Sequence, residues 1–147
     1  MQLTNFTDYG MRALMRMAAT PDQVLSVAEI ADEFGISRNH LAKCMGVLSR
    51  AGFITTRRGG GGGALLARPA DQIRLGDVVL VLSEQVPLVE CFRPDGGNCS
   101  LCNSCALRVR LAAARHAFLA KLNESTLADI ALTPRRPALR IPQHEEA

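Results

Sequence analysis

The chain has 147 residues, of which 48% are apolar, and a formal net charge of +3. This length is typical of one domain, or of one small domain with an appendage, and the apolar content is sufficient for a packed core. No apolar run is long enough to span a membrane, and the N-terminal segment lacks the basic and apolar regions of a secretory signal. We therefore expect a cytoplasmic protein with reduced thiols and no membrane partner.

The excess positive charge lies in the first half of the chain. Residues 1–70 contain eight Lys or Arg and five Asp or Glu, whereas residues 71–147 contain nine of each. A modest excess of this kind favours contact with nucleic acid but does not decide it.

Two helices are predicted before residue 36. Thr7 and Asp8 suit the start of the first, TDYGMRALMRMAATP. The second, SVAEIADEFGIS, begins at Ser26, has Glu29 three residues later as in a capping box, and ends at Gly35. The apolar residues predicted to face the core from the first helix are Met11, Leu14, Met15 and Ala18.

A third helix, RNHLAKCMGVLSRAG, follows Ser37 as its expected cap. Two helices joined by a short turn that contains glycine are typical of a helix-turn-helix. The expected buried stripe of the third helix consists of Leu41, Cys44, Met45 and Leu48.

A β-hairpin is predicted next. FITTRR and ALLARP flank a glycine run from Gly59 to Gly63, and such a tip can approach a phosphate backbone closely because it carries no side chains. The fold class is thus mainly α with a small β-hairpin wing, a winged helix-turn-helix. The alternative is that the glycines form a plain linker.

The polar residues at the start of the third helix are candidates for reading DNA. Arginine pairs with guanine and asparagine with adenine in the major groove, and the first residues of a recognition helix enter that groove. The alternative to DNA binding is that they are solvated residues of an ordinary helical domain. The candidate DNA-binding residues are Ser37, Arg38, Asn39, His40 and Lys43, with Arg58 and Gly59 on the wing.

Four of the five cysteines lie in ECFRPDGGNCSLCNSC: Cys91, Cys99, Cys102 and Cys105. This loop is rich in turn residues and has no evident core that would need them, whereas Cys44 is expected to be a small buried apolar residue. Zinc usually takes two separated ligand pairs, whereas an iron–sulfur cluster accepts thiolates with two residues between them, as in Cys99, Cys102 and Cys105. Spare reduced thiols are the third interpretation.

A helix is predicted over RLGDVVLVLSEQ before the loop, and a long helix, ALRVRLAAARHAFLAKLNE, after it. The stripe Leu107, Leu111, Ala114, Phe118 and Leu122 should pair the long helix with a second copy. We see no catalytic constellation, since His40, His116 and His144 are scattered, and we expect neither an enzyme nor an electron carrier.

The segments LTNFTDYGMRAL, GISRNHLAKCMGVLSRAGFI and IRLGDVV, with the cysteine loop, resemble the Rrf-type winged-helix iron–sulfur regulators over residues 1–132. Within that family the chain is most similar to the nitric-oxide-sensing NsrR group. The resemblance implies a homodimeric repressor that binds double-stranded DNA at an imperfect palindrome and releases it when nitric oxide attacks a [4Fe-4S] cluster, a [2Fe-2S] cluster being the alternative.

The same resemblance implies the cluster ligands. They are Cys91, Cys99 and Cys105 of one subunit and Asp8 of the other, with Cys102 as an alternative fourth ligand. IscR-like relatives use a His just after the last Cys, where this chain has Ala106, Leu107 and Arg108. A RirA- or IscR-like sensor of iron or cluster status remains the alternative function. The wing departs from the family pattern, because Gly60 and Leu65 stand where cations are usual.

These expectations divide the chain into four parts. Residues 1–83 form a winged-helix DNA-binding region, and residues 84–105 a cysteine-rich cluster-binding loop. Residues 106–132 form a dimerisation helix and a short terminal helix, and residues 133–147, with their prolines, a disordered tail.

Overall fold

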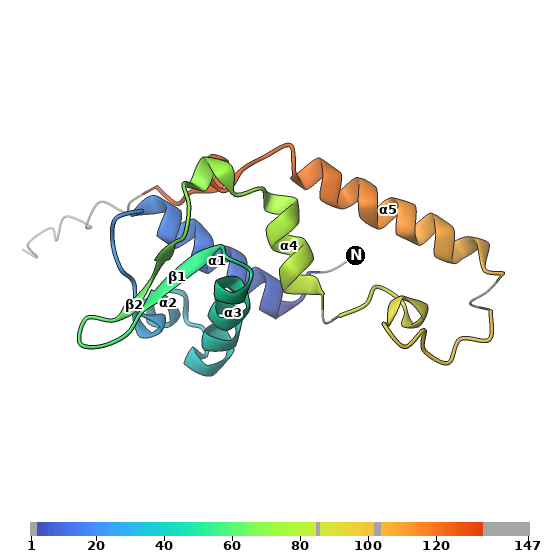
Figure 1. The fold of residues 1–147 in the computed structure, drawn as a ribbon, viewed down its shortest axis with the longest axis horizontal. Helices are drawn as coiled ribbons and strands as arrows, with labels where there is room; N and C mark the ends of the chain where they lie inside the picture. The colour runs from blue at the N-terminus through green and yellow to red at the C-terminus, as the bar shows by residue number, and fades with distance from the viewer. Residues whose placement is uncertain (1–2, 85, 102–103, 134–147) are drawn as a thin grey trace, which may run out of the picture.

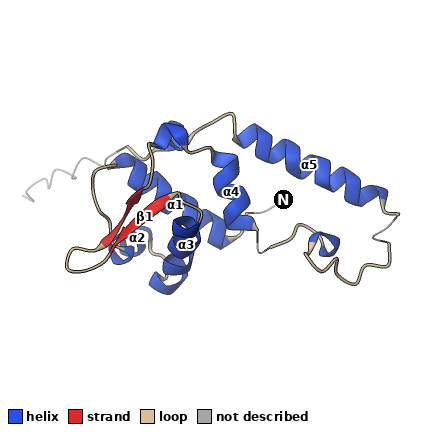
Figure 2. Ribbon diagram, viewed as in Figure 1, coloured by secondary structure: helices blue, strands red, loops and turns tan. Residues whose placement is uncertain are grey.

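The computed structural model describes residues 3–84, 86–101 and 104–133. Its helices are α1 (Asn5–Ala19), α2 (Val27–Phe34), α3 (Arg38–Arg50), α4 (Leu75–Ser83) and α5 (Ala106–Leu122). Two antiparallel strands, β1 (Ile54–Arg57) and β2 (Gly63–Leu66), form the hairpin, and 3-10 turns occur at Ala70–Gln72, Glu90–Phe92 and Leu127–Ile130. The predicted fold class, mainly α with a small hairpin, is confirmed (Figures 1 and 2).

Helix α1 begins earlier than the sequence suggested. Its N-cap is Thr4, whose hydroxyl accepts a hydrogen bond of 3.2 Å from the backbone N–H of Thr7. The prediction that Thr7 and Asp8 start the helix was wrong, because both already lie in its first turn, and Thr7 is fully buried. The buried face is formed by Ala13, Leu14 and Met17, whereas Met11, Met15 and Ala18 are only partly buried at its edge.

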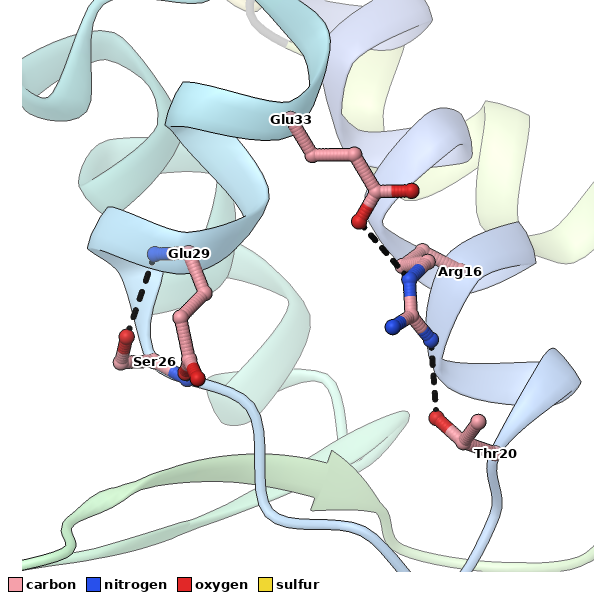
Figure 3. Close-up of polar contacts among 5 residues, drawn as sticks. All are labelled: Arg16, Thr20, Ser26, Glu29 and Glu33. Atoms are coloured by element: carbon pink, nitrogen blue, oxygen red, sulfur yellow. Dashed lines mark hydrogen bonds and ion pairs between the residues drawn. The ribbon is translucent and has the colours of Figure 1, made fainter. Parts of the chain in front are cut away.

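Helix α2 begins with the predicted capping box. The backbone N–H of Glu29 donates to the Ser26 hydroxyl (3.1 Å), and the Ser26 N–H donates to the Glu29 carboxylate (2.7 Å) (Figure 3). The hydrogen bond from the Ser26 backbone N–H, and after it the interaction of the Ser26 hydroxyl with the same carboxylate, lower the pKa of Glu29, because both favour its charged form. The helix ends at Gly35, whose φ of 65° lies in the left-handed region that glycine adopts without strain.

Helix α3 buries the predicted stripe of Leu41, Cys44, Met45 and Leu48. Ser37 occupies the N-cap position, but its side chain makes no capping hydrogen bond, so the hydroxyl does not have the capping role that we predicted. α3 packs on α1, α2, α4 and β1, which places it at the centre of one core. The fully buried side chains of that core include Leu14, Met17, Ile30, Leu41, Leu48, Ile54, Ile73, Val78 and Leu127.

Besides the packing of its strands on α1 and α3, the wing is bonded through its backbone to the segment before α2. Leu25 and Ala64 exchange two backbone hydrogen bonds, of 2.9 and 2.8 Å, so Leu25 extends the sheet by an isolated bridge. Gly63 was predicted to lie in the glycine tip, but it belongs to β2, where it pairs with Arg57 of β1. A Cβ on Gly63 would lie only 2.5 Å from the Leu25 carbonyl oxygen, so a glycine is needed for this close approach.

Helices α4 and α5 meet at one end. Gly76 lies so close to the Leu119 carbonyl that a Cβ would collide with it. The side-chain amide of Asn123 accepts from the Asp77 N–H (3.1 Å) and donates to the Asp77 carboxylate (2.9 Å). From this junction α5 extends away from the winged helix toward the cysteine loop (Figure 1). Within the described ranges, no helix is both long and apolar enough to cross a membrane.

Candidate nucleic-acid interface and cysteine loop

The start of α3 presents its polar side chains to solvent. Ser37, Arg38, Asn39, His40 and Lys43 are all exposed, while the apolar stripe of the same helix faces the core. This division follows from the 3.6-residue period, which directs side chains three or four apart to one face. All five predicted α3 residues are therefore accessible at the start of the helix, and three of them, Asn39, His40 and Lys43, share one face by their spacing.

Arg38 is held by a carboxylate of the neighbouring helix. Its Nε and Nη2 atoms donate to Asp32 of α2 at 2.8 to 3.3 Å, and both side chains are 63% exposed. This contact was not predicted from the sequence, because it joins two helices across a turn.

Wing cations extend the exposed positive surface. Arg57 ends β1, Arg58 and Gly59 follow it, and all three are exposed. Of the cations in residues 3–70, Arg12, Arg16 and Arg38 form ion pairs, whereas Lys43, Arg50, Arg57 and Arg58 form none with described residues. Arg57 and Arg50 were missed as candidates, although TTRRGG places two adjacent cations beside the glycine tip.

Cys44 is part of the core, as predicted. Its side chain is fully buried, and its thiol donates to the Phe6 carbonyl oxygen at 3.4 Å. Burial raises the pKa of the Cys44 thiol to about 11, because the apolar surroundings disfavour the thiolate. A protonated buried thiol is a poor nucleophile and a poor metal ligand.

The described cysteines of the loop have different surroundings. Cys91 lies in the Glu90–Phe92 turn and is 8% exposed, whereas Cys99 and Cys105 are half-buried, Cys105 at the N-cap of α5. The Glu90 carboxylate accepts a 3.0 Å hydrogen bond from the Asn98 N–H, which ties the turn of Cys91 to the residue before Cys99. Cys102 lies outside the described residues.

Asp8 lies on the accessible side of α1, half-buried. Its carboxylate forms an ion pair of 2.8 Å with Arg12, one turn later on the same helix. A carboxylate that is part of an exposed pair costs little to move to another partner, because such pairs contribute only about 0–1 kcal/mol.

The donor chemistry of the loop fits an iron–sulfur cluster, but the described residues of one chain do not form a complete ligand set. Thiolates are the soft ligands that such clusters use, and three described cysteines supply them. Among the described residues, however, no three Cys, His, Asp or Glu side chains come together as a metal-binding group. The family resemblance implies that the fourth ligand, Asp8, is contributed by a second copy of the chain.

Comparison with known proteins agrees with this architecture. A profile of the Rrf2 family, described as an iron-dependent transcriptional regulator, matches residues 3–133. The solved structure of T. potens IscR superposes with a TM-score of 0.68 at 24% identity, over 88% of this chain and 85% of that one.

CymR proteins are also similar. The oxidised form of Staphylococcus aureus CymR gives a TM-score of 0.66 at 26% identity, over 89% of this chain and 96% of that one. CymR of B. subtilis, the global cysteine regulator of that organism, gives 0.67 at 25% identity over the same shares. The hairpin following α3 is thus the wing of a winged helix, and the chain belongs to the Rrf2 family of transcriptional regulators.

Proposed function

We propose that this Rrf2-family regulator is an NsrR-like repressor that releases its operator when nitric oxide reacts with a [4Fe-4S] cluster bound by the cysteine loop. The observation that carries the proposal is the placement of the thiols. Cys91, Cys99 and Cys105 occupy one loop between α4 and α5, whereas Cys44 is fully buried in α3; of the three loop thiols Cys91 is buried, and Cys99 and Cys105 are half-buried. No packing role explains the two half-buried thiols, whereas cluster binding does.

The DNA-binding side of the proposal uses α3 and the wing. Regulators of this family bind DNA, typically as dimers. With two copies, the α3 helices would enter successive major grooves about 34–36 Å apart, which requires an imperfect palindrome as the operator. Arg38 and Asn39 are the proposed base readers, while Lys43, Arg58 and the Gly59 backbone contact phosphates.

The sensing side uses the loop and the start of α1. Cys91, Cys99 and Cys105 would hold the cluster, and Asp8 of the second copy would complete the ligand set as the harder ligand. When bound, the cluster supplies iron that reacts with nitric oxide. Asp8 would then link the DNA-binding half of one subunit to the loop of the other, so losing that ligand removes a restraint between the two recognition helices.

A general sensor of iron or cluster status, of the RirA or IscR kind, is the second candidate. It is favoured by the family description as iron-dependent and by the structural similarity to IscR. The two candidates differ in the stimulus that causes DNA release. Nitric oxide should act on an NsrR-like protein while iron is abundant, whereas an iron-status sensor should respond to chelation alone.

Anaerobic purification tests the proposal. The protein should contain about four irons and four sulfides per chain, the composition of a cubane cluster. DNA enriched by the protein from a randomised duplex library serves as the probe, and fluorescence anisotropy should show its release on adding nitric oxide. A colourless protein that contains one zinc per chain would refute the cluster.

Asp8 is tested in mixed dimers. One subunit carries Asp8→Ala and the other Cys99→Ala. If ligation crosses between subunits, both lesions fall on one cluster and the other stays intact, so about half of the iron remains. Ligation within a subunit would damage both clusters. Cys102→Ala is the matched control and should keep the full iron content, and its loss of iron would assign Cys102 as the fourth ligand.

A further inference from the structure

Asp32 contacts Arg38 through two nitrogen atoms of the guanidinium group, whereas a simple ion pair needs only one. Both side chains are 63% exposed, and exposed pairs contribute only about 0–1 kcal/mol to folding. Yet the carboxylate engages Arg38 along one edge, through Nε at 3.3 Å and through Nη2 at 2.8 and 3.1 Å. Two-point contact fixes the plane of the guanidinium group, which a single contact would leave free to rotate.

The other edge of the same group stays accessible. Nη1 donates to no described residue, and Nη2 has a second hydrogen that points away from Asp32. Arginine reads guanine with two adjacent N–H groups directed at O6 and N7. Holding one edge of the fork therefore leaves the pair Nη1 and Nη2 oriented as a base-reading edge, at the first residue of α3.

The charge of Asp32 adds a second effect. A carboxylate beside Arg38 repels phosphate oxygens, so the guanidinium gains less from a sequence-independent backbone contact. Orientation and repulsion act in the same direction, since both favour contact with a base over contact with a phosphate. Asp32 is not one of the candidate DNA-contacting residues. Its effect on DNA binding would be exerted through Arg38.

From this geometry we propose that Asp32 is a positioning residue that sets DNA sequence specificity by orienting Arg38 toward a base edge. The inference rests on the proposed base-reading role of Arg38. It predicts that removing the carboxylate weakens discrimination between sequences while binding to arbitrary DNA is maintained or strengthened. A residue with only a structural role would instead lower both kinds of binding together, in proportion to the loss of folded protein.

Selection from a randomised duplex library tests this with the full-length protein, purified anaerobically. Asp32→Ala and Asp32→Asn should reduce the preference at one base-pair position in each half-site by about ten-fold, the discrimination of one lost bidentate contact. Affinity for unselected duplexes should rise, because a negative charge near the phosphates is removed. Thermal melting checks that both variants fold.

Glu33→Gln is the matched control. Glu33 lies next to Asp32 on α2, but its carboxylate pairs with Arg16 of α1 (Figure 3). This variant removes the same charge without touching Arg38. It should leave the selected motif unchanged.

Arg38→Ala separates the failure of this inference from that of the proposed function. If Arg38→Ala changes the motif while both Asp32 variants enrich the wild-type motif unchanged, the role of Asp32 is refuted and base reading stands. If Arg38→Ala also leaves the motif unchanged, or if the wild type enriches none, the base-reading role and the inference fall together. In the Arg38→Ala background, Asp32→Ala should have no further effect on sequence preference.

Discussion

The winged-helix half and α5 use their apolar side chains in opposite ways. In the first half, Leu14, Leu41 and Leu48 are completely buried within one chain. In α5 no residue is buried, and Leu107 and Val109 are 63% and 68% exposed. Large apolar side chains that are exposed on a helix are candidates for an interaction surface. The contrast indicates that the first half is folded by its own core, whereas α5 is completed by another surface, in keeping with the dimers typical of this family.

The largest effect is expected from comparing Cys99, in the loop before α5, with Cys44, in the core of the winged-helix half. Cys99→Ala should abolish iron binding, measured by iron and sulfide analysis, because the cluster loses one of its few ligands. Its effect on the melting temperature of the iron-free protein should be small, since Cys99 is outside the buried core.

Cys44→Ala is the matched change in the core. It should keep the iron but lower the free energy of unfolding by about 1–3 kcal/mol, because a fully buried side chain is truncated. In the wild type the Cys44 thiol should resist alkylation at neutral pH, since its pKa is about 11. If Cys44→Ala lost its iron while Cys99→Ala kept it, the proposed roles of the two cysteines would be contradicted.

Substitutions on α5 test whether its apolar stripe is the dimer interface. Leu107→Asp and Leu111→Asp should shift dimers toward monomers in light scattering, because burying a carboxylate at an apolar interface is unfavourable. Ala113→Asp is the control, since Ala113 is exposed on α5 but lies off the predicted stripe. Dimers unchanged by all three substitutions would show that this stripe is not the interface.

Two glycines of the hairpin test how firmly the wing is attached. Gly63→Ala should lower stability by about 1–3 kcal/mol and weaken DNA binding, because its methyl group would collide with the Leu25 carbonyl and displace the bridge to Ala64. Gly60→Ala has open space around the added carbon and should leave the melting temperature nearly unchanged. Equal effects in thermal melting would mean that the bridge does not hold the wing.

The smallest predicted effect concerns the α2 capping box. The pKa of Glu29 is lowered from its ordinary value of 4.5, so its stabilising contribution is complete above that value and is lost as the pH falls through the lowered pKa. Glu29→Gln should therefore reduce stability at neutral pH and flatten the acid side of a plot of melting temperature against pH. Asp22→Asn, in the exposed segment after α1, should not alter the curve. An unchanged acid limb in Glu29→Gln would contradict the prediction.

Local signals made most of the winged helix predictable. The Ser26–Glu29 box and the Leu41 to Leu48 stripe depend on spacing within one helix, and both were confirmed. The start of α1 was misplaced because Thr4 and Thr7 are both suitable caps, and only burial of Thr7 separates them.

Contacts between elements were harder to derive. Asp32 and Arg38 meet across a turn, and Gly63 meets Leu25 from a distant segment, so no periodicity reports either contact. The cysteine pattern predicted the candidate loop, but a ligand set shared between two copies cannot be assembled from one chain. The ligand roles of Asp8 and of the loop cysteines therefore stay predictions.

The junction of Gly76, Asp77 and Asn123 makes α5 a lever. Its 17 residues form a rod about 25 Å long at 1.5 Å per residue, with Cys105 at the far end and the α4 contact at the near end. For a rod of that length, a displacement of about 2 Å at Cys105 corresponds to a rotation of about 5° at the junction. Because Gly76 leaves no gap there for a side chain, such a rotation would be transmitted directly to α4, and α4 packs on both α1 and α3.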